Sequence, residues 1–431
     1  MEMTIVYAGP SVVESKWPRV WDAGVNRDKP YHSMRELVAA AVASRGDVVL
    51  DLANIAPDFK FPILTMLSKH AYKFSKYRSQ KPRSRTFVIH DNDVRVREMV
   101  MAIHYADLAR DLQNEPSNHM LPEILARNVR SRLRAAYRVR VMDEREIEQR
   151  GMGLIMAVGQ GSDHPPRFVV AKRMKDPNFP TICLVGKGVT FDAGGLRLKP
   201  ASSMMDMKQD KSGAAVVATI LAYIAEVAPH LEVNLVGIMP MVENVINGTA
   251  TRPGDVVTAH DGSNVEVMDT DAEGRLIIAD AISYSKKFKP DYIIDFGTLT
   301  SFASNLCCDL SSVHYTPSDA MSELVSQVAE ATGERTWRLP PWTEYSRDTT
   351  STVADMRNAI FNCTRGGSYM AAMFISNFVP KRCQKRWVHF DIGNNSVAGN
   401  FSGNTAVLGM ELVKKLAEKG IKLKQSKKRR A

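Results

Sequence analysis

The chain has 431 residues and a formal charge of +10, and its length exceeds the roughly 250–300 residues at which a single core stops growing, which predicts two domains. Because no apolar run reaches the ~18–20 residues of a membrane span and residues 1–4 do not open a secretion signal, we expect a cytoplasmic protein without a membrane partner, with nuclear and mitochondrial locations left open. Five scattered cysteines without a Cys-x-x-Cys spacing indicate a reducing compartment and exclude a thiolate zinc site, so oxygen and nitrogen would bind any metal.

Residues 1–92 predict a small N-terminal α/β domain with a mostly parallel sheet. Short apolar runs alternate there with segments of helical periodicity, in the order Thr4–Ala8, Met34–Ala43, Val48–Leu52, Ile63–Phe74 and Thr86–Ile89. His70 and His90 lie in or beside these elements, where a lone histidine is usually structural. One long helical pattern, Val94–Leu112, predicts a connector helix over residues 93–112.

Residues 113–420 predict a larger C-terminal α/β catalytic domain, with a mixed, mostly parallel sheet flanked by helices. The expected strands are Phe168–Ala171, Thr181–Val185, Val233–Met239, Asp291–Asp295 and Trp387–Asp391, and the expected helices are Gly213–Val227, Leu276–Lys286 and Thr405–Lys419. Ligands of such sheets bind at the carboxyl ends of strands. Residues 421–431 form a basic tail, which is expected either to be solvated and frayed or to contact nucleic acid or another polyanion.

Two charged segments stand out, one between a turn and an expected helix and one directly after an expected strand. Asp269–Leu276 contains three carboxylates and one arginine in an otherwise apolar stretch, and such charges must take up protons, pair with cations or bind metal. Gly186–Pro200 follows a strand and alternates two lysines and an aspartate with glycines. A phosphate-binding loop is the obvious rival for this second segment, but its spacing Gly-x-x-x-x-Gly-Lys-Ser/Thr is absent.

From the two segments and Asp210, four carboxylates and three cationic groups are selected as the candidate cluster. Four carboxylates suit two divalent cations ~3.5–4 Å apart, whereas a lysine donates to an oxyanion or, when neutral, binds a metal. The alternative is a network of ion pairs on the protein surface. It fits poorly, because glycine-rich ends of strands are typical of ligand-binding sites and are poor places for solvent-exposed charges. The candidate residues are Lys187, Asp192, Lys199, Asp210, Asp271, Glu273 and Arg275.

At these residues the sequence resembles the leucyl aminopeptidase family of two-metal exopeptidases, from about Arg110 to Gly409. The family signature Asn-Thr-Asp-Ala-Glu-Gly-Arg-Leu appears as Asp269–Leu276, with only its first residue changed. Further blocks occur in the family's order, namely Asp111–Pro116, Gly151–Gly153, Gly159–Ser162, Val185–Pro200, Thr251–Val256 and Thr298–Thr300.

The resemblance implies a role for each matching position. Lys187, Asp192, Asp210 and Glu273 would bind a tightly held metal. Asp192, Asp271, with its main-chain carbonyl, and Glu273 would bind an exchangeable one. Lys199 would be the electrophilic lysine, and Arg275 would retain a bicarbonate that acts as general base. Met207 would form a wall of the pocket for the first side chain, together with Thr298, Leu299, Thr300 and Ser301; the Leu299 carbonyl would face the leaving nitrogen.

The implied activity is hydrolysis of amino-terminal leucine and other apolar residues from peptides by a metal-bridged hydroxide. The resemblance also implies two divalent ions (zinc, manganese or cobalt), a bound bicarbonate and a homohexamer built from two trimers. The N-terminal domain would be shorter than is usual in the family.

Some positions depart from the family pattern. Asp269 replaces asparagine and adds negative charge beside both expected metals, Arg197 replaces a small residue, and Met205 replaces an acidic one. Ser301 replaces a glycine that lines the substrate pocket, and Gly393-Asn394 replaces alanine-glycine. These changes predict altered metal affinity, rate or specificity.

Two other functions remain open. One is an assembly of the same fold that binds DNA or another polyanion with weak or no catalysis. The other is a different two-metal hydrolase such as a phosphoesterase, which a lysine ligand disfavours. His389 and Asp391 lie on an apolar strand and are assigned to structure. Met204, Met205 and Met207 are assigned to pocket or core, because no cysteine or histidine accompanies them.

Overall fold

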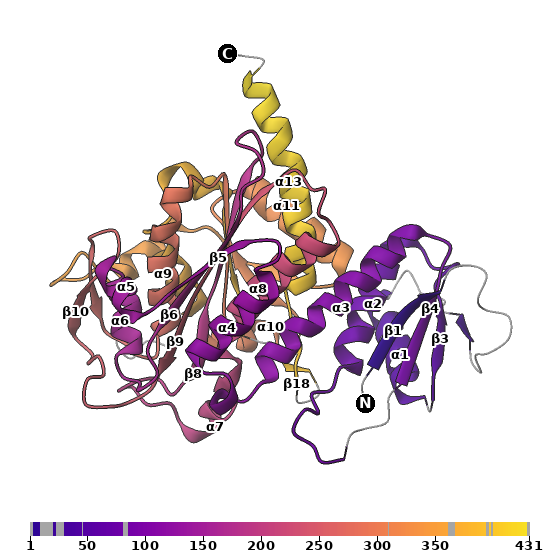
Figure 1. The fold of residues 1–431 in the computed structure, drawn as a ribbon, viewed down its shortest axis with the longest axis horizontal. Helices are drawn as coiled ribbons and strands as arrows, with labels where there is room; N and C mark the ends of the chain where they lie inside the picture. The colour runs from indigo at the N-terminus through magenta and orange to yellow at the C-terminus, as the bar shows by residue number, and fades with distance from the viewer. Residues whose placement is uncertain are drawn as a thin grey trace.

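The computed structural model describes residues 3–8, 20–22, 30–44, 46–80, 85–308, 310–360, 367–393, 396–397 and 400–428. It contains two α/β units side by side, with one long helix between them (Figure 1). None of the described helices is long and apolar enough to cross a membrane. The mixed α/β fold with a mostly parallel catalytic sheet, predicted from the sequence, is confirmed.

The N-terminal unit contains a four-stranded parallel sheet. Its strands lie in the order β1 (Met3–Ala8), β4 (Arg85–His90), β3 (Val48–Asp51) and β2 (Val20–Asp22). Helices α1 (Pro30–Ala43) and α2 (Pro57–Ala71) connect them. Crossover helices of this kind cover the faces of parallel sheets, which accounts for the buried apolar strand β3.

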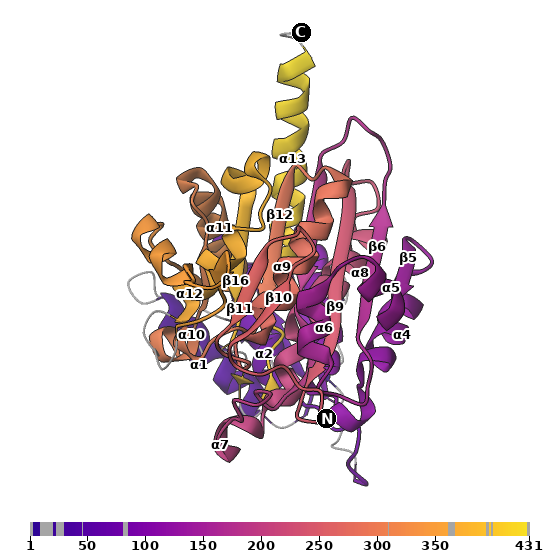
Figure 2. The same ribbon diagram turned by 90° about the vertical axis from the view of Figure 1, so that its left-hand side faces the viewer.

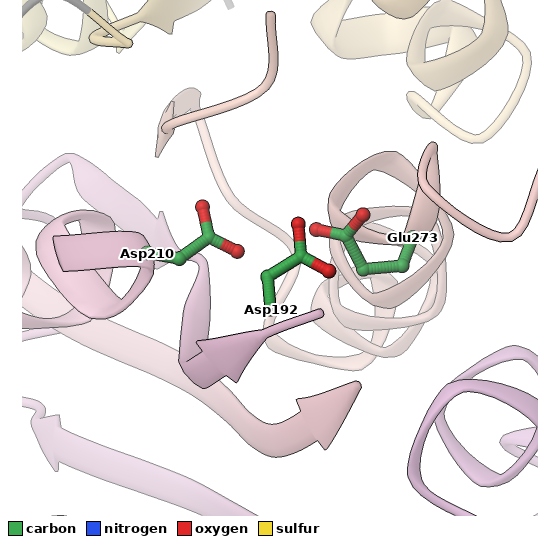
Figure 3. Close-up of side chains that lie close together, drawn as sticks. All are labelled: Asp192, Asp210 and Glu273. Carbon is green, nitrogen blue, oxygen red and sulfur yellow. The ribbon is translucent and has the colours of Figure 1, made fainter. Parts of the chain in front are cut away.

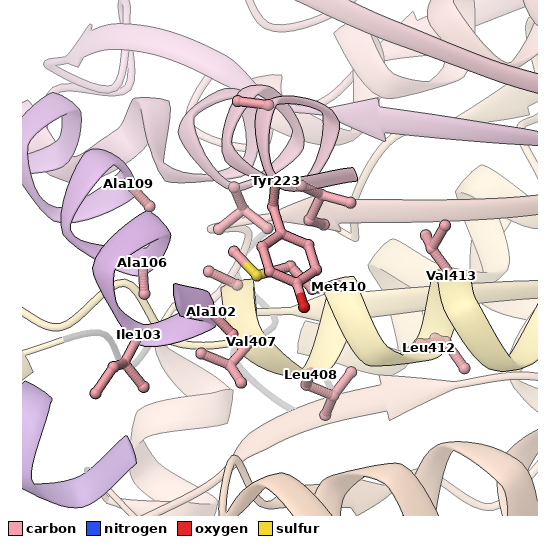
Figure 4. Packing of buried hydrophobic residues seen from close by; sticks show 14 of the residues in the cluster. Ala102, Ile103, Ala106, Ala109, Tyr223, Val407, Leu408, Met410, Leu412 and Val413 are labelled. Atoms are coloured by element: carbon pink, nitrogen blue, oxygen red, sulfur yellow. The ribbon is translucent and has the colours of Figure 1, made fainter. Parts of the chain in front are cut away.

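The predicted connector is helix α3 (Val94–Asn114), whose first turn is capped by the Asp93 carboxylate. Its small residues let it pack closely against α8 (Ser212–Glu226) and α13 (Ala406–Lys428). Figure 4 shows Ala102 and Ala106 of α3 beside Tyr223 of α8 and Val407 of α13. The connector is therefore part of the catalytic unit's core.

The catalytic unit is built on a nine-stranded mixed sheet. The strand order is β14 (Thr336–Arg338), β13 (Ser312–Tyr315), β16 (Trp387–Asp391), β12 (Tyr292–Gly297), β7 (Thr181–Gly186), β9 (Asn234–Asn244), β6 (Arg167–Arg173) and β5 (Arg138–Met142), with β8 (Gly188–Asp192) also paired to β9. Strands β9, β7, β12 and β16 run parallel, whereas β5, β6 and β13 contribute antiparallel pairs.

Helices cover both faces of this sheet (Figures 1 and 2). Side chains alternate along β7, so that Ile182 and Leu184 enter one core while Cys183 and Val185 enter the other. The first face is covered by α3, α4 (Pro122–Leu133), α8, α11 (Asp319–Thr332) and α13. The second is covered by α5 (Glu144–Gln149), α6 (Gly153–Gly159), α9 (Glu273–Ser285), α10 (Ser301–Cys307) and α12 (Gly367–Ser376).

Several short elements complete the unit. They are α7 (Ala201–Met204), the 3-10 turn η2 (Met207–Lys211), and two small sheets of β10 (Asp255–Thr258), β11 (Asn264–Val267) and β15 (Met356–Arg357), and of β17 (Ser396–Val397) and β18 (Asn400–Phe401). Strand β8 lies where the sequence suggests only a glycine-rich loop.

Helix α13 continues to Lys428, beyond the Lys419 expected from the sequence, and projects from the body (Figure 1). Lysine has a good helix propensity, and no proline or glycine follows Gly420 in the helix. Part of the predicted basic tail is therefore helical, whereas residues 429–431 lie outside the described residues.

Candidate active site

The site lies at the carboxyl ends of three neighbouring strands. Lys187 follows β7, Asp192 ends β8, and Thr298 follows β12, so these residues meet at one edge of the sheet. Asp210 comes from η2, just before α8, and Glu273 begins α9. The positive end of a helix macrodipole stabilises negative charge at such helix starts.

Three carboxylates point toward one another in this space (Figure 3). Oxygens of Asp192, Asp210 and Glu273 all lie within 4.8 Å of one another. Each of these residues is at most 3% exposed. Negative charges on three neighbouring carboxylates repel one another strongly when water is excluded. The cluster therefore needs cations to compensate its charge.

The Lys187 ammonium group is one such cation. Its Nζ lies 2.8 Å from Asp210 Oδ1 and 2.6 Å from Glu273 Oε1, and it donates to the Thr298 carbonyl at 2.6 Å. A Cβ at Gly274 would lie 2.6 Å from this Nζ, so only glycine lets α9 approach so closely. Burial lowers the pKa of Lys187, but the surrounding carboxylates outweigh it and hold the pKa above the usual range.

The Lys199 ammonium group is the second. Its Nζ lies 2.7 Å from Asp192 Oδ2 and also contacts Asp271 Oδ1. Burial opposes its charge, whereas Asp192, Glu273 and Asp271 raise its pKa above the usual range. The two lysines thus divide the cluster, because Lys187 contacts Asp210 and Glu273 while Lys199 contacts Asp192 and Asp271.

Within the described residues, the four carboxylates of the cluster form ion pairs with these two ammonium groups and with no other cation. Burial raises the pKa of Asp192, Asp210 and Glu273, and burial together with Asp192 raises that of Asp271 to about 8. Among the described residues, none donates a hydrogen bond to the buried Asp210 Oδ2. Four carboxylates with excess negative charge, one of which has a buried oxygen without a hydrogen bond, suit divalent cations, so these residues fit the expected metals.

Asn244 and Asn358 support the cluster, although neither residue was identified from the sequence. Asn244 Nδ2 donates to Asp192 Oδ1 at 2.7 Å and to the Thr270 carbonyl at 3.0 Å. Asn358 Nδ2 donates to the Asp269 carbonyl at 2.7 Å, and the Asn358 carbonyl accepts from Arg275 Nη1 at 2.7 Å. In the sequence, Asn244 directly follows an apolar run, which is a weak indication of a residue at the end of a strand. No comparable sequence feature identifies Asn358.

Arg275 is buried on the first turn of α9. Within the described part of the chain its Nε has no hydrogen-bond partner. A buried guanidinium with an unused N–H fits a small oxyanion such as bicarbonate.

The Thr298–Thr300 turn is fixed by Asp391. Thr298 Oγ1 donates to Asp210 Oδ1 at 2.7 Å, the Leu299 amide donates to Asp391 Oδ1 at 3.2 Å, and Thr300 Oγ1 donates to Asp391 Oδ2 at 2.7 Å. Ser301, the first residue of α10, is exposed, and Met207 is half-buried at the start of η2.

His389 does not pair with Asp391. Its Nδ1 lies 2.5 Å from Asp295 Oδ1, and Trp387 Nε1 donates to Asp295 Oδ2 at 2.6 Å. His389 contacts Asp295, whereas Asp391 accepts hydrogen bonds from the Thr298–Thr300 turn. These separate contacts agree with the expectation that the two residues are structural and do not act as a pair.

A family model described as "Cytosol aminopeptidase family, catalytic domain" matches residues 107–413. A probable cytosol aminopeptidase of Chlorobium limicola is 40% identical over 319 residues, which are 73% of this chain and 62% of the relative's length. One of Legionella pneumophila is 35% identical over 367 residues, which cover 84% of this chain and 74% of the relative.

Solved structures of the bottromycin maturation enzyme BotP, one of them in complex with Mn, are also similar. They are 28% identical, with a TM-score of 0.80, over 96% of this chain and 99% of theirs.

Proposed function

The chain belongs to the cytosol aminopeptidase family, and we propose that it is a metal-dependent aminopeptidase that releases leucine and other apolar residues from the amino end of peptides. The observation that carries the proposal is the cluster of four carboxylates and two lysines at the carboxyl edge of the sheet, which is buried except at Asp271 and Lys199. Its excess negative charge favours cations and the α-amino group of a substrate.

Two sets of residues would hold divalent cations. Asp192, Asp210, Glu273 and Lys187 form one set, in which Lys187 would bind a metal only after losing its proton, while Asp192, Asp271 and Glu273 form the other. Bound there, zinc, manganese or cobalt would polarise the scissile carbonyl and lower the pKa of a water molecule. The BotP structure in complex with Mn supports this proposal.

The protein's own groups would orient the substrate and stabilise charge. The Lys199 ammonium, at the more open side of the cluster, would donate to the developing oxyanion, a contribution commonly worth a few kcal/mol. Arg275 would hold bicarbonate, which would accept a proton. The Leu299 carbonyl would accept a hydrogen bond from the leaving nitrogen. Met207 and Leu299 would offer apolar surface to the first side chain.

Turnover of a leucine anilide with manganese, cobalt or zinc tests the proposal directly. Failure with all three metals would contradict it. Lys199→Ala should retain metal and lose most of kcat, whereas Asp271→Asn should lose metal content. Unchanged metal in the second variant would refute this division of roles.

We also propose a hexamer of two trimers, by resemblance to the family. Sedimentation that gave a stable monomer would contradict it. A polyanion-binding role is the second candidate, favoured by the projecting end of α13 and its basic sequence. Binding of duplex DNA that weakens steeply with salt would support it.

A further inference from the structure

Arg197 and Asp269, two departures from the family pattern, contact each other. Arg197 Nη1 forms an ion pair with Asp269 Oδ2, across 72 residues of sequence. Arg197 lies two residues before Lys199, and Asp269 lies two residues before Asp271. The pair therefore joins the loop that carries one ammonium group to the turn that carries two carboxylates.

Two hydrogen bonds between the main chain and the Thr270 hydroxyl already connect the same loops. The Arg197 amide donates to Thr270 Oγ1 at 2.9 Å, and this hydroxyl donates to the Gly194 carbonyl at 2.7 Å. Gly194 adopts φ +92°, and a Cβ there would lie 2.3 Å from the Arg197 carbonyl. The ion pair closes the outer side, where the Arg197 side chain is 39% exposed and that of Asp269 15%.

Both carboxylate oxygens of Asp269 are engaged away from the lysines. Oδ1 accepts from the Asp271 amide at 2.9 Å, and Oδ2 pairs with Arg197. Asparagine could make the first contact, because its side-chain oxygen accepts equally well, but only a carboxylate makes a charge-paired second contact. The extra negative charge expected from the sequence is thus compensated by the extra positive one.

We propose that Arg197 is a positioning residue that acts through Asp269 to hold the Lys199 loop against the Asp271–Glu273 turn. Lys199 Nζ contacts Asp192, on its own side, and Asp271, across the gap between the loops. If the two loops moved apart, the Lys199 ammonium group would shift relative to the reacting carbonyl of the substrate. Displacements of about 1 Å can lower the rate by up to about a hundredfold. This inference rests on the proposed function.

The test compares Arg197→Gln, Asp269→Asn and the double variant with the wild type. Arg127→Gln is the matched control, since Arg127 forms an exposed ion pair with Glu123 on α4, far in sequence from the site. For each protein, kcat and KM are measured on leucine anilide with manganese, manganese affinity by calorimetry, and amide exchange of residues 194–199 and 268–272 without metal.

We expect each single variant to lower kcat about tenfold with KM changed less than about twofold. Exchange in both loops should accelerate about fivefold, because one contact restraining local opening is lost. The double variant should resemble either single one, since both remove the same interaction. Arg197→Lys should recover part of kcat, and Arg127→Gln should match the wild type.

A direct effect of charge on the metals would give a different pattern. Arg197→Gln would then tighten manganese binding and Asp269→Asn would weaken it, whereas positioning predicts affinities within about twofold of the wild type. Opposite shifts, additive losses of kcat, or unchanged exchange in both loops would overturn the proposal. An inactive wild type would refute the proposed function instead, and the exchange measurement would still decide whether the pair holds the loops together.

Discussion

The parallel sheet of the N-terminal unit and the parallel part of the mixed catalytic sheet both carry charged side chains at the carboxyl ends of their strands, and the two edges differ in charge balance. In the N-terminal unit, Lys60 Nζ lies 2.5 Å from Asp91 Oδ2, and His90 Nδ1 lies 3.0 Å from Asp51 Oδ1. Each of these two carboxylates has a basic group beside it. In the catalytic unit, four carboxylates share the ammonium groups of Lys187 and Lys199.

This difference in charge balance distinguishes the N-terminal edge, which is structural, from the catalytic edge, which is the candidate site. Strand ends alone supply a place where polar side chains converge. A balanced pair satisfies its own charge, whereas an unbalanced cluster retains affinity for cations. Four substitutions can break or sharpen this contrast.

The largest expected effect is on activity, at the catalytic edge. Glu273→Gln should lower kcat at least about a thousandfold, because it removes a proposed metal ligand. The same change should leave the free energy of unfolding of the metal-free protein unchanged or raised, since Lys187 still has Asp210 and the Thr298 carbonyl. Activity assays and urea unfolding check both parts, and a clear destabilisation would contradict the second.

At the N-terminal edge the expected effect is on stability. Asp91→Asn should cost about 3 kcal/mol of unfolding free energy, because the buried Lys60 ammonium loses its charged partner. The amide can still accept the Asp93 amide hydrogen bond, made at 2.7 Å in the wild type. At temperatures where the variant is folded, kcat should equal that of the wild type. A large loss of kcat there would break the contrast between the edges.

Asp280 is a buried carboxylate that accepts hydrogen bonds from backbone amides, and the pH dependence of its contribution to stability sharpens the comparison. It accepts from the His260 amide at 2.8 Å and the Ile155 amide at 3.1 Å, yet burial raises its pKa to about 7. A raised folded-state pKa stabilises the protein below the unfolded value of about 3.9, and this stabilisation is lost as pH rises toward 7.

The Tm of the wild type minus that of Asp280→Asn should therefore increase by a few degrees from pH 8 to pH 5. Differential scanning fluorimetry of both proteins across this range measures it. A difference independent of pH would mean that the backbone amides keep Asp280 ionised throughout.

The smallest effect is expected at Asp51, which is partly exposed beside His90. Asp51→Asn should change unfolding free energy by less than about 1 kcal/mol, because exposed ion pairs contribute little. The side-chain oxygen of the new asparagine can still accept the hydrogen bond that the Ala53 amide donates to Asp51 Oδ1 at 3.0 Å in the wild type. A loss comparable to that of Asp91→Asn would show that burial does not separate the two pairs.

The central strands were predictable because they are buried on both faces and therefore almost uniformly apolar, as in Thr181–Gly186 and Tyr292–Gly297. Strand β5 was missed although its alternation of arginine and valine is typical of a half-exposed strand, whereas β8 was missed because its glycine and its charged neighbours indicated a loop. The helix over Glu273–Ser285 was anticipated within a few residues, and its position placed Glu273 beside a strand end.

The candidate site was also partly predictable. All four carboxylates and both lysines named from the sequence meet at one sheet edge. Asn244 and Asn358 were missed, because an isolated asparagine has no spacing that distinguishes it. The division of the lysines between carboxylate pairs was also invisible, since it depends on where separate loops meet.

By itself, the sequence determined the fold class, the charged segments and the expectation that they need cations, because periodicity and local charge density are properties of neighbouring residues. Only the tertiary structure decided which charges compensate which. Asp269 and Arg197 were two unrelated substitutions in the sequence and form one ion pair in space. His389 and Asp391 are two residues apart on one strand and have different partners. The physical reason is that pairing depends on contacts across sheets and loops, which local sequence patterns do not encode.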